Sequence, residues 1–417
     1  MKMKTIPKEE GLDHTISMFK EGYDYVANRN NEFDSNLFET RLLGERVICM
    51  TGKEAGELFY DNDKFLRAGA APKHVQKTLL GEKGVQTLDG KAHHHRKAMF
   101  MELMNPEHIK QLGKLTADEW ERKLSEWGEG ADIQLYEQAQ EILTRVAVRW
   151  AGVPLEEKDV PKRTKQLVQL FESPTSVGIQ YLRGTSARKE LEEWIAGLVS
   201  DVREGNLQPP TGTALLTFSN HHDLEGLPLD ERIAAVEVLN IVRPIVAISI
   251  YIAFLGHALI THPEERGKLE GSKEQPFENF VQETRRLYPF FPFNAARVKE
   301  DFVWNGVSFK KDTLVIFDFY GTNHDEKSWP DPHEFRPDRF DEDKVTPFNF
   351  VPQGGGDYAT GHRCAGEWAT IEVMKVSLDY LANRMSYEVP DQELDYSKTS
   401  IPTIPESEIV LKHIRRN

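Results

Sequence analysis

The chain has 417 residues, of which 52 are Lys or Arg and 67 are Asp or Glu, so its formal net charge is −15. Its 39% of hydrophobic residues can build a core, and the acidic balance argues against nucleic acid or an anionic membrane surface as a partner. Two cysteines, Cys49 and Cys364, are too few for a disulfide scaffold or a four-cysteine zinc site.

Helical periodicity dominates, because apolar residues recur at three- and four-residue spacing in most segments. In chain order the predicted helices are 12–28, 53–61, 107–127, 134–150, 156–171, 187–204, 229–260, 279–288 and 367–385. Strand-like runs are fewer, at 46–51, 296–304, 313–319 and 408–412. The chain shows no repeat and no linker between independent units. We therefore predict one domain over residues 1–417, mainly α with a small β portion.

The segment 229–260 is the most apolar part of the chain. As one helix it would be about 48 Å long, and because it is apolar on most sides we expect it to run through the protein centre. Its apolar part, 245–260, is short of the roughly 20 residues that a bilayer requires. The first ten residues carry no apolar targeting segment. We expect a cytoplasmic protein without a membrane anchor.

A glycine-rich loop surrounds Cys364. Residues 350–356 read FVPQGGG, and residues 361–366 read GHRCAG directly before a predicted helix. Backbone N–H groups and the positive end of that helix both favour a thiolate at this position. Such a thiolate is either a nucleophile or a metal ligand, and a buried structural cysteine is the alternative that Cys364 alone leaves open.

Two further motifs precede this loop. Glu283 and Arg286 lie three residues apart on one predicted helix face, and Arg339 belongs to the segment FRPDRF at 335–340. The Glu-x-x-Arg helix, this segment and the cysteine loop, in that order, resemble the cytochrome P-450 superfamily. The resemblance implies that fold, with heme b between the long central helix and the loop. It also implies that Cys364 is the axial ligand of the heme iron and that Glu283, Arg286 and Arg339 form a buried structural triad.

The segment DGKAHHHRK at 89–97 matches the part of the superfamily in which a histidine and a basic residue four positions later bind a heme propionate. The resemblance therefore implies that His93 and Lys97 contact the cofactor, and Arg67 is a further candidate for this role. Neighbouring side chains on a helix point about 100° apart. The three consecutive histidines of this segment therefore cannot converge on one metal ion.

The central helix departs from the pattern of the oxygen-using members of the superfamily. Where those proteins have an acidic residue and a threonine that deliver protons to dioxygen, this chain has Arg243 and Pro244. Proline costs a helix interior about 3 kcal/mol, and a buried charge must be paired. Arg243 either pairs with Glu237 or a heme propionate, or it awaits an anionic ligand such as a carboxylate, which a guanidinium binds through two hydrogen bonds.

The Arg-Pro pair is the hallmark of the bacterial fatty-acid peroxygenases within this superfamily, and segments along the whole chain resemble that branch. They include KEGY at 20–23, APKHVQ at 71–76, YPFFPF at 288–293 and YGTNHD at 320–325. The resemblance implies hydroxylation of long-chain fatty acids at the α or β carbon with hydrogen peroxide, without an obligatory redox partner.

The same resemblance implies that the substrate supplies the missing acid–base group. Arg243, next to Pro244, would hold the fatty-acid carboxylate. The carboxylate would accept a proton from hydrogen peroxide and return one to the leaving oxygen. A substrate without a carboxylate should therefore react poorly.

Four other residues are candidates for the pocket. Leu80 stands where the family usually has phenylalanine, and Phe290 and Phe293 are candidate walls for which core packing is the alternative. At the position of Gln86, members of the branch that release terminal alkenes by decarboxylation often carry histidine, whereas hydroxylating members carry glutamine. Neutral glutamine cannot donate a proton as histidinium could, so we favour hydroxylation, with some decarboxylation alongside it.

Other classes of function stay open at this level. The chain could be mainly an alkene-forming decarboxylase or a monooxygenase that depends on dioxygen and a reductase. It could also be a heme-bound sensor or a helical protein without heme. The preferred chain length and the oligomeric state do not follow from the sequence.

Overall fold

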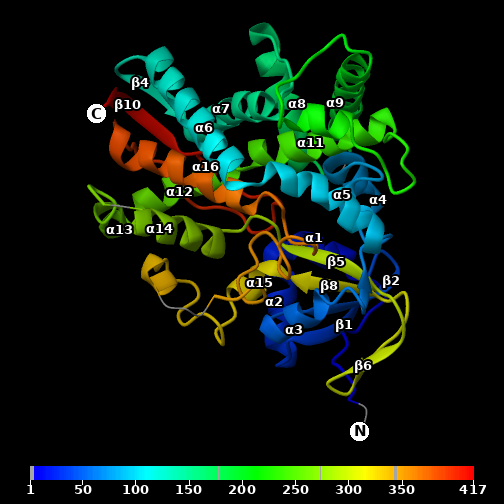
Figure 1. Cartoon of the computed structure of the whole chain (residues 1–417). Helices are drawn as coiled ribbons and strands as arrows, with labels where there is room; N and C mark the ends of the chain where they lie inside the picture. Colours follow the sequence, from blue (N-terminus) through cyan, green and yellow to red (C-terminus); the bar gives the residue numbers. More distant parts are fainter. Residues whose placement is uncertain (1–3, 177, 273, 342–344) are drawn as a thin grey trace.

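The computed structural model describes residues 4–176, 178–272, 274–341 and 345–417 (Figure 1). Most of the long helices lie in the upper part of the view, with β4 and β10 at their edge. The N-terminal strands lie below them beside β5 and β8, together with the short helices α2, α3 and α15. Residues 1–3, which belong to the N-terminal stretch predicted to carry no targeting segment, lie outside the described residues. The mainly α architecture with a small β portion is confirmed.

Within the described residues the strands form three sheets. The largest has the order β1 (Leu37–Leu42), β2 (Glu45–Met50), β8 (Leu314–Asp318), β5 (Phe293–Val298) and β3 (Phe65–Leu66). Its β2 and β8 pair in parallel, and the other neighbours are antiparallel. The second sheet has the order β4 (Ala131–Gln134), β10 (Val410–Arg416) and β9 (Met385–Glu388), and the third pairs β6 (Phe302–Trp304) with β7 (Val307–Phe309).

Most predicted helices are present with bounds close to those expected. The long ones are α5 (Gly90–Leu103), α6 (Pro106–Trp127), α7 (Leu135–Ala151), α8 (Val160–Glu172), α9 (Ile179–Arg203), α11 (Glu231–Ala247), α12 (Ser249–Thr261), α14 (Glu274–Leu287) and α16 (Glu367–Asp379). The shorter ones are α1 (Thr15–Glu21), α2 (Tyr25–Phe33), α3 (Lys53–Phe59), α4 (Lys73–Val75), α10 (Ala214–Ser219), α13 (Pro263–Gly267) and α15 (Phe319–Asn323). Two short π-helical turns, Gln76–Leu80 and Tyr380–Arg384, continue α4 and α16.

Two predicted segments are divided in the structure. The segment 12–28 is not one helix, because Gly22 has a φ of 55° and a side chain there would meet the carbonyl oxygen of Lys398 at 2.0 Å. This close approach of two backbone segments admits only glycine and separates α1 from α2. The strand-like run 296–304 likewise divides into β5 and β6.

The prediction of one continuous central helix is wrong. The segment contains two helices, α11 and α12, which meet at Ile248. Pro244 has no N–H, and its ring crowds the preceding turn of the helix. One turn later, the N–H of Ile248 bonds to the carbonyl oxygen of Ile245 at 3.2 Å, which is the tighter spacing of a 3-10 turn.

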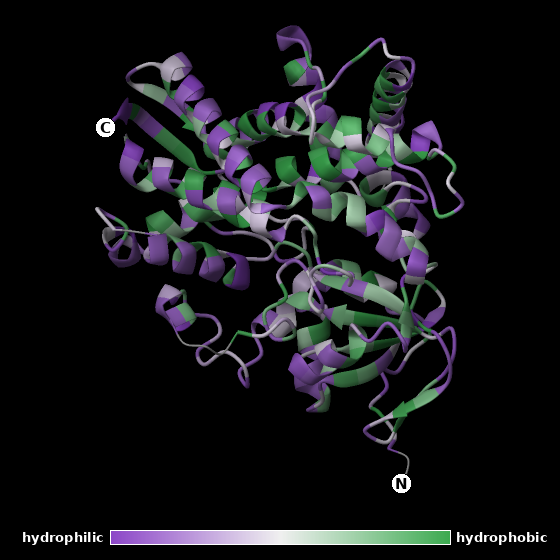
Figure 2. Cartoon of the chain, viewed as in Figure 1, coloured by the Kyte–Doolittle hydropathy of each residue, from purple (hydrophilic) through white to green (hydrophobic). Residues whose placement is uncertain are grey.

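The core is centred on α11 and α12, which are mostly apolar along their length (Figure 2). In the part of the chain that the structure describes, Glu231–Thr261 is the one helical stretch long and apolar enough to cross a membrane. However, 94% of its most apolar window is buried inside the protein. The pair is therefore the central element of the core, as the sequence predicts, although it is not one helix.

Candidate functional site

Cys364 lies in the turn that leads into α16. Its backbone N–H donates to the carbonyl oxygen of Gln353 at 3.2 Å, and the side-chain amide nitrogen of Gln353 lies 3.8 Å from the Cys364 Sγ. Gly356 lets the loop approach closely, because a Cβ there would meet the Cβ of Tyr60 at 2.9 Å. Burial raises the pKa of the Cys364 thiol, whereas the N–H of Gly366 acts in the opposite direction.

Lys97 and His93, both buried on α5, lie against this loop. The Lys97 ammonium donates to the carbonyl oxygens of Gly361 and of Arg363, the latter at 2.9 Å. Burial lowers the pKa of Lys97 to about 8. The His93 ring stacks on the ring of His362 with the centroids 3.9 Å apart, and burial lowers the pKa of His93 to about 3.

Arg67 follows β3 and reaches the same region from the sheet. Its guanidinium lies over the ring of Phe59, 4.2 Å from the centroid, and donates to the Phe59 carbonyl oxygen at 3.1 Å. Burial lowers the pKa of Arg67 to about 10. The nearby carboxylate of Asp89 accepts instead from the backbone N–H groups of Arg67 and Ala68, at 2.8 Å each. Among the described residues, the Arg67 Nε has no hydrogen-bond partner.

The structure brings the three members of the predicted triad together in a buried cluster. Arg286 forms two hydrogen bonds with the Glu283 carboxylate, at 2.7 and 2.9 Å. Arg339 donates to the same carboxylate at 3.0 Å. Both arginines also donate to backbone carbonyl oxygens of the segment 330–334. One carboxylate with its two cations therefore ties α14 to the irregular segment that precedes the cysteine loop.

Sequence reasoning did not find a second ion cluster, which is centred on Glu367, three residues after Cys364. Glu367, the first residue of α16, accepts from Arg285 at 2.6 Å and from Arg363 at 2.5 Å. Glu367 and Arg285 are buried. The spacing of Arg363 and Glu367, four residues apart, was the available signal.

Arg243 lies on α11 with 8% of its surface exposed. Its nearest polar contact is the carboxamide oxygen of Asn240 at 3.5 Å, and among the described residues its Nε has no partner. The alternative that Arg243 pairs with Glu237 is wrong, because Glu237 forms its ion pair with Arg96 at 2.9 Å. Burial lowers the pKa of Arg243 to about 9, and the positive charge of Arg188 acts in the same direction. The guanidinium is therefore charged at neutral pH and has no anionic partner in the described part of the chain.

Gln86 lies close to Arg243 because both side chains contact Asn240. Gln86 belongs to the 3-10 turn Val85–Thr87, and its side-chain oxygen accepts from the Asn240 amide at 3.3 Å. Pro244, the next residue on α11, is a position without an N–H donor inside the helix. The structure thus brings Gln86, Arg243 and Pro244 to one place, and it adds Asn240, which sequence reasoning missed.

The apolar residues predicted for the pocket, Leu80, Phe290 and Phe293, do not all lie together. Leu80 and Phe290 both pack against the large helical core, and the Phe290 ring stacks on that of Tyr251 with the centroids 4.3 Å apart. Phe293 begins β5 and packs instead in a separate cluster beside β1 and β2. Tyr251 is fully buried, and its hydroxyl has no partner among the described residues.

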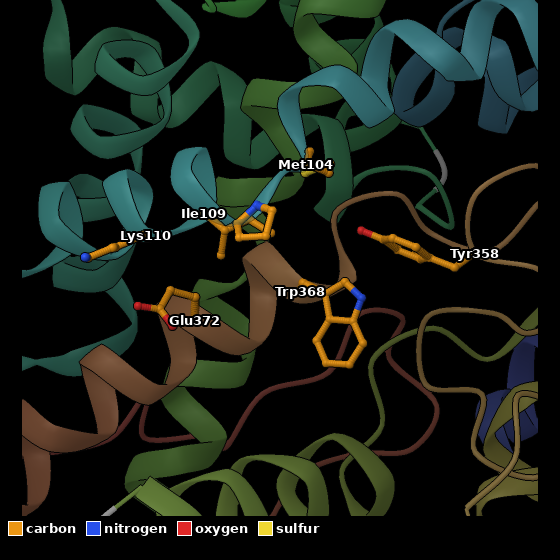
Figure 3. Close-up of a pocket in the computed structure, with 7 residues that line it drawn as sticks. Met104, Ile109, Lys110, Tyr358, Trp368 and Glu372 are labelled. Atoms are coloured by element: carbon orange, nitrogen blue, oxygen red, sulfur yellow. The ribbon is translucent and has the colours of Figure 1, made fainter.

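A surface hollow of about 550 Å³ lies beside the start of α16 (Figure 3). It is lined by Met104, Pro106, Ile109, Lys110, Tyr358, Trp368 and Glu372. Arg243, Gln86 and Leu80 are not among these residues. The hollow is therefore separate from the group around Asn240 that was predicted to bind substrate.

The donors around Cys364 fit a heme. In the described residues, no group of three or more His, Cys, Asp or Glu side chains could hold a metal ion. A cysteine thiolate is one of the axial ligands that heme iron takes in proteins. Arg67 is a buried cation with a free donor near the loop, which suits a propionate. Lys97 contacts only carbonyl oxygens there and has a further donor to offer.

Comparison with known proteins agrees with this site. Residues 277–411 match the family model described as Cytochrome P-450. The chain is 51% identical to Cytochrome P-450EX alpha (CYP152N1), solved with myristic acid, over 99% of this chain and 100% of that one, with a TM-score of 0.96. It is 36% identical to a variant of cytochrome P-450 OleT in complex with arachidonic acid, over 99% of both chains, with a TM-score of 0.95.

One curated relative matches over a shorter stretch. Cytochrome P-450 3A15 of Cavia porcellus is 29% identical over 227 residues. The match covers 49% of this chain and 44% of that protein, so the chain spans less than half the length of this relative.

Proposed function

Because this chain belongs to the cytochrome P-450 superfamily, and to its bacterial fatty-acid peroxygenase branch, we propose that it hydroxylates long-chain fatty acids at the α or β carbon with hydrogen peroxide. The observation that carries this proposal is Arg243, a buried cation without an anionic partner among the described residues. Holding such a charge away from water is costly unless a ligand pairs with it. The proposed activity occupies the one domain that we predict for residues 1–417.

The proposed cofactor is heme b, with Cys364 as the axial ligand of the iron. Lys97 and Arg67 would bind the propionates, since both present donors near the cysteine loop. His93 is uncharged at neutral pH, because its pKa is lowered to about 3. It would therefore act as a neutral hydrogen-bonding group at the same edge. When bound, the thiolate-ligated heme supplies the chemistry that activates peroxide.

Arg243 would bind the substrate carboxylate. A guanidinium presents two parallel N–H donors that match the two oxygens of a carboxylate. The contact to Asn240, at 3.5 Å, is made by an uncharged oxygen, so it leaves the positive charge of the guanidinium without an anionic partner. A carboxylate held at this point fixes the first carbons of the chain relative to Arg243, and hydroxylation at the α or β carbon follows from that anchoring.

The bound carboxylate would also act as the general acid–base. In this proposal it accepts one proton from hydrogen peroxide and returns a proton to the leaving oxygen, which departs as water. The net reaction converts R–H and hydrogen peroxide to R–OH and water. Pro244 has no backbone N–H, so the carbonyl oxygen of Asn240, one turn earlier, lacks its intrahelical donor beside Arg243.

Gln86 favours hydroxylation over decarboxylation in this proposal. Its side-chain oxygen accepts a hydrogen bond from Asn240, so its two N–H donors are directed elsewhere. The group is neutral and has no proton to transfer at pH 7. The alternative product, a terminal alkene formed by loss of carbon dioxide, is an outcome that the same assay reports.

Leu80 and Phe290 would contact the alkyl chain, because both lie partly exposed at the edge of the helical core. Phe293 packs in another cluster and would take part only through the neighbouring strand. We therefore propose Leu80 and Phe290 as the chain-length determinants, and Phe293 as a weaker candidate.

The experiment uses the heme-loaded protein with myristic acid and hydrogen peroxide, without a reductase, and identifies products by mass spectrometry. Arg243→Ala and Arg243→Lys are assayed in parallel, with methyl myristate as the substrate that lacks a carboxylate. The proposal expects hydroxy acids from the wild type, little product from Arg243→Ala, and little product from the ester.

Partial activity of Arg243→Lys is expected, because lysine keeps the charge but cannot bind a carboxylate through two donors. Turnover that requires a reductase and dioxygen would contradict the proposal and favour a conventional monooxygenase. Equal turnover of the acid and the ester would show that the carboxylate has no acid–base role.

A further inference from the structure

Asn240 is a buried residue, 6% exposed, that joins the candidate catalytic side chains to each other. Its amide nitrogen lies 3.0 Å from the Glu237 carboxylate and 3.3 Å from the Gln86 side-chain oxygen. Its oxygen lies 3.5 Å from the Arg243 Nη2. A carboxamide has two N–H donors, so Glu237 and Gln86 use both of them. The oxygen is left to face Arg243.

Glu237 determines which way this carboxamide points. An ionised carboxylate can only accept hydrogen bonds, so it must meet the nitrogen of Asn240 and not the oxygen. Its negative charge is held by Arg96, which reaches it from α5 at 2.9 Å. Glu237 is fully buried, and the Arg96 side chain is 12% exposed. The ion pair thus gives the carboxamide one favoured orientation.

We propose that Asn240 is a positioning residue, oriented by the Glu237–Arg96 pair, that sets the Arg243 guanidinium and the Gln86 amide relative to each other. This inference rests on the proposed function, because its effect is on the binding of a fatty-acid carboxylate. With its oxygen toward Arg243, Asn240 restricts the guanidinium while adding no negative charge, so the positive charge stays available to the ligand. With its nitrogen toward Gln86, it turns the Gln86 donors away from itself.

The neutrality of Asn240 is essential to this role. An aspartate at the same place would form an ion pair with Arg243 and compete with the substrate. A leucine or alanine would take the Asn240 oxygen away from the guanidinium and one donor away from the Glu237 carboxylate. Asparagine supplies both the donor that Glu237 needs and an uncharged acceptor for Arg243.

The test is a double-mutant cycle on the heme-loaded protein, with the Kd for myristic acid measured by absorption titration. Asn240→Ala should raise this Kd about tenfold, the size expected for one hydrogen bond to a charged group. In the Arg243→Ala background the same change should alter the Kd by less than about twofold, because its effect passes through Arg243. Binding of methyl myristate should not change.

Two variants guard against a purely structural effect. Asn279→Ala removes another buried carboxamide, which lies on α14 and donates to Asp341 at 2.6 Å. This variant should leave the Kd for myristic acid unchanged. Glu237→Gln keeps the shape but not the charge, and it should raise the Kd about threefold because the Asn240 carboxamide loses its fixed orientation. If Asn240→Ala loses its heme absorption band or its far-ultraviolet spectrum, Glu237→Gln decides the question.

The outcomes separate the two levels of inference. If the wild type does not bind myristic acid, or if Arg243→Ala does not weaken binding, the proposed function itself fails. If Arg243→Ala weakens binding but Asn240→Ala does not, or if Asn240→Ala acts equally in both backgrounds, only the positioning role is refuted.

Discussion

Replacing Arg243 by methionine should stabilise the folded protein while weakening its binding of fatty acid. Burial lowers the pKa of this guanidinium from its ordinary value to about 9. At about 1.4 kcal/mol per pH unit, the fold disfavours the charged form by about 5 kcal/mol. The folded pKa is depressed, so this cost is fully present below pH 9 and vanishes only above the unfolded value. At pH 7 the whole cost of burying the charged guanidinium therefore lowers the free energy of unfolding.

Methionine removes the charge but also removes the contact to Asn240. Leaving that buried oxygen without its donor costs about 1–3 kcal/mol. Methionine is similar in length to the stem of arginine and fills most of its space. The net expectation is that Arg243→Met unfolds with a free energy about 2–4 kcal/mol higher than that of the wild type.

Arg286→Met is the matched control, because it removes a buried arginine that is fully paired. Its two hydrogen bonds to Glu283 are 2.7 and 2.9 Å long. Removing Arg286 leaves the buried Glu283 carboxylate with Arg339 as its remaining cation and takes the donor from the backbone oxygens of Asn323 and Pro332. Breaking a buried pair in this way costs about 3–5 kcal/mol. Both substitutions replace a buried arginine by methionine, and they should change the free energy of unfolding in opposite directions.

Thermal unfolding of the heme-loaded protein, followed by circular dichroism and by heme absorption at pH 7, measures both changes. At roughly 2 cal/mol/K per residue, a chain of 417 residues shifts its Tm by about 1 °C per kcal/mol. Arg243→Met should therefore gain about 2–4 °C, and Arg286→Met should lose about 3–5 °C. If both variants lose stability equally, Arg243 has an anionic partner in the heme-loaded protein. The argument that Arg243 is free to bind a substrate carboxylate then fails.

Three other substitutions test separate parts of the fold. Burial lowers the pKa of His324 to about 3, so between pH 7 and pH 5 only the unfolded histidine takes up a proton. Over this range the free energy of unfolding of the wild type should fall by about 2 kcal/mol more than that of His324→Gln. Urea unfolding at the two pH values measures this, and equal losses of unfolding free energy would contradict it. Lys97→Met should release heme several-fold faster than the wild type, as measured by transfer to an apo-globin, because the variant loses the cation that holds two carbonyl oxygens of the cysteine loop. Gly81 has a φ of 79°, and a Cβ at this position would meet the Arg188 Nη2 at 2.1 Å. Gly81→Ala should therefore lower the free energy of unfolding, measured in urea, by about 1–3 kcal/mol. A loss below about 0.5 kcal/mol would show that the Arg188 side chain moves aside freely.

Local patterns in the sequence predicted most of the elements and the cysteine loop. The apolar periodicity of 107–127 and 134–150 depends only on residues three and four apart, and α6 and α7 have nearly those bounds. The order of the motifs predicted the family, which the comparisons confirm. The proline in the central segment was also visible, but the position of the break at Ile248 was not, because a helix absorbs a proline over a full turn that depends on its packing.

The partners of the buried charges required the tertiary structure. Glu237 is six residues from Arg243 in the sequence, yet it pairs with Arg96, 141 residues away. Asn240 has no motif of its own, and its contacts to Gln86 and Arg243 exist only after α11 packs beside the turn Val85–Thr87. The sequence by itself determined which charged residues and which helices the protein has. Hydrogen bonds and ion pairs are short-ranged and directional, so only the packing of those helices decided which buried charge has no anionic partner among the described residues.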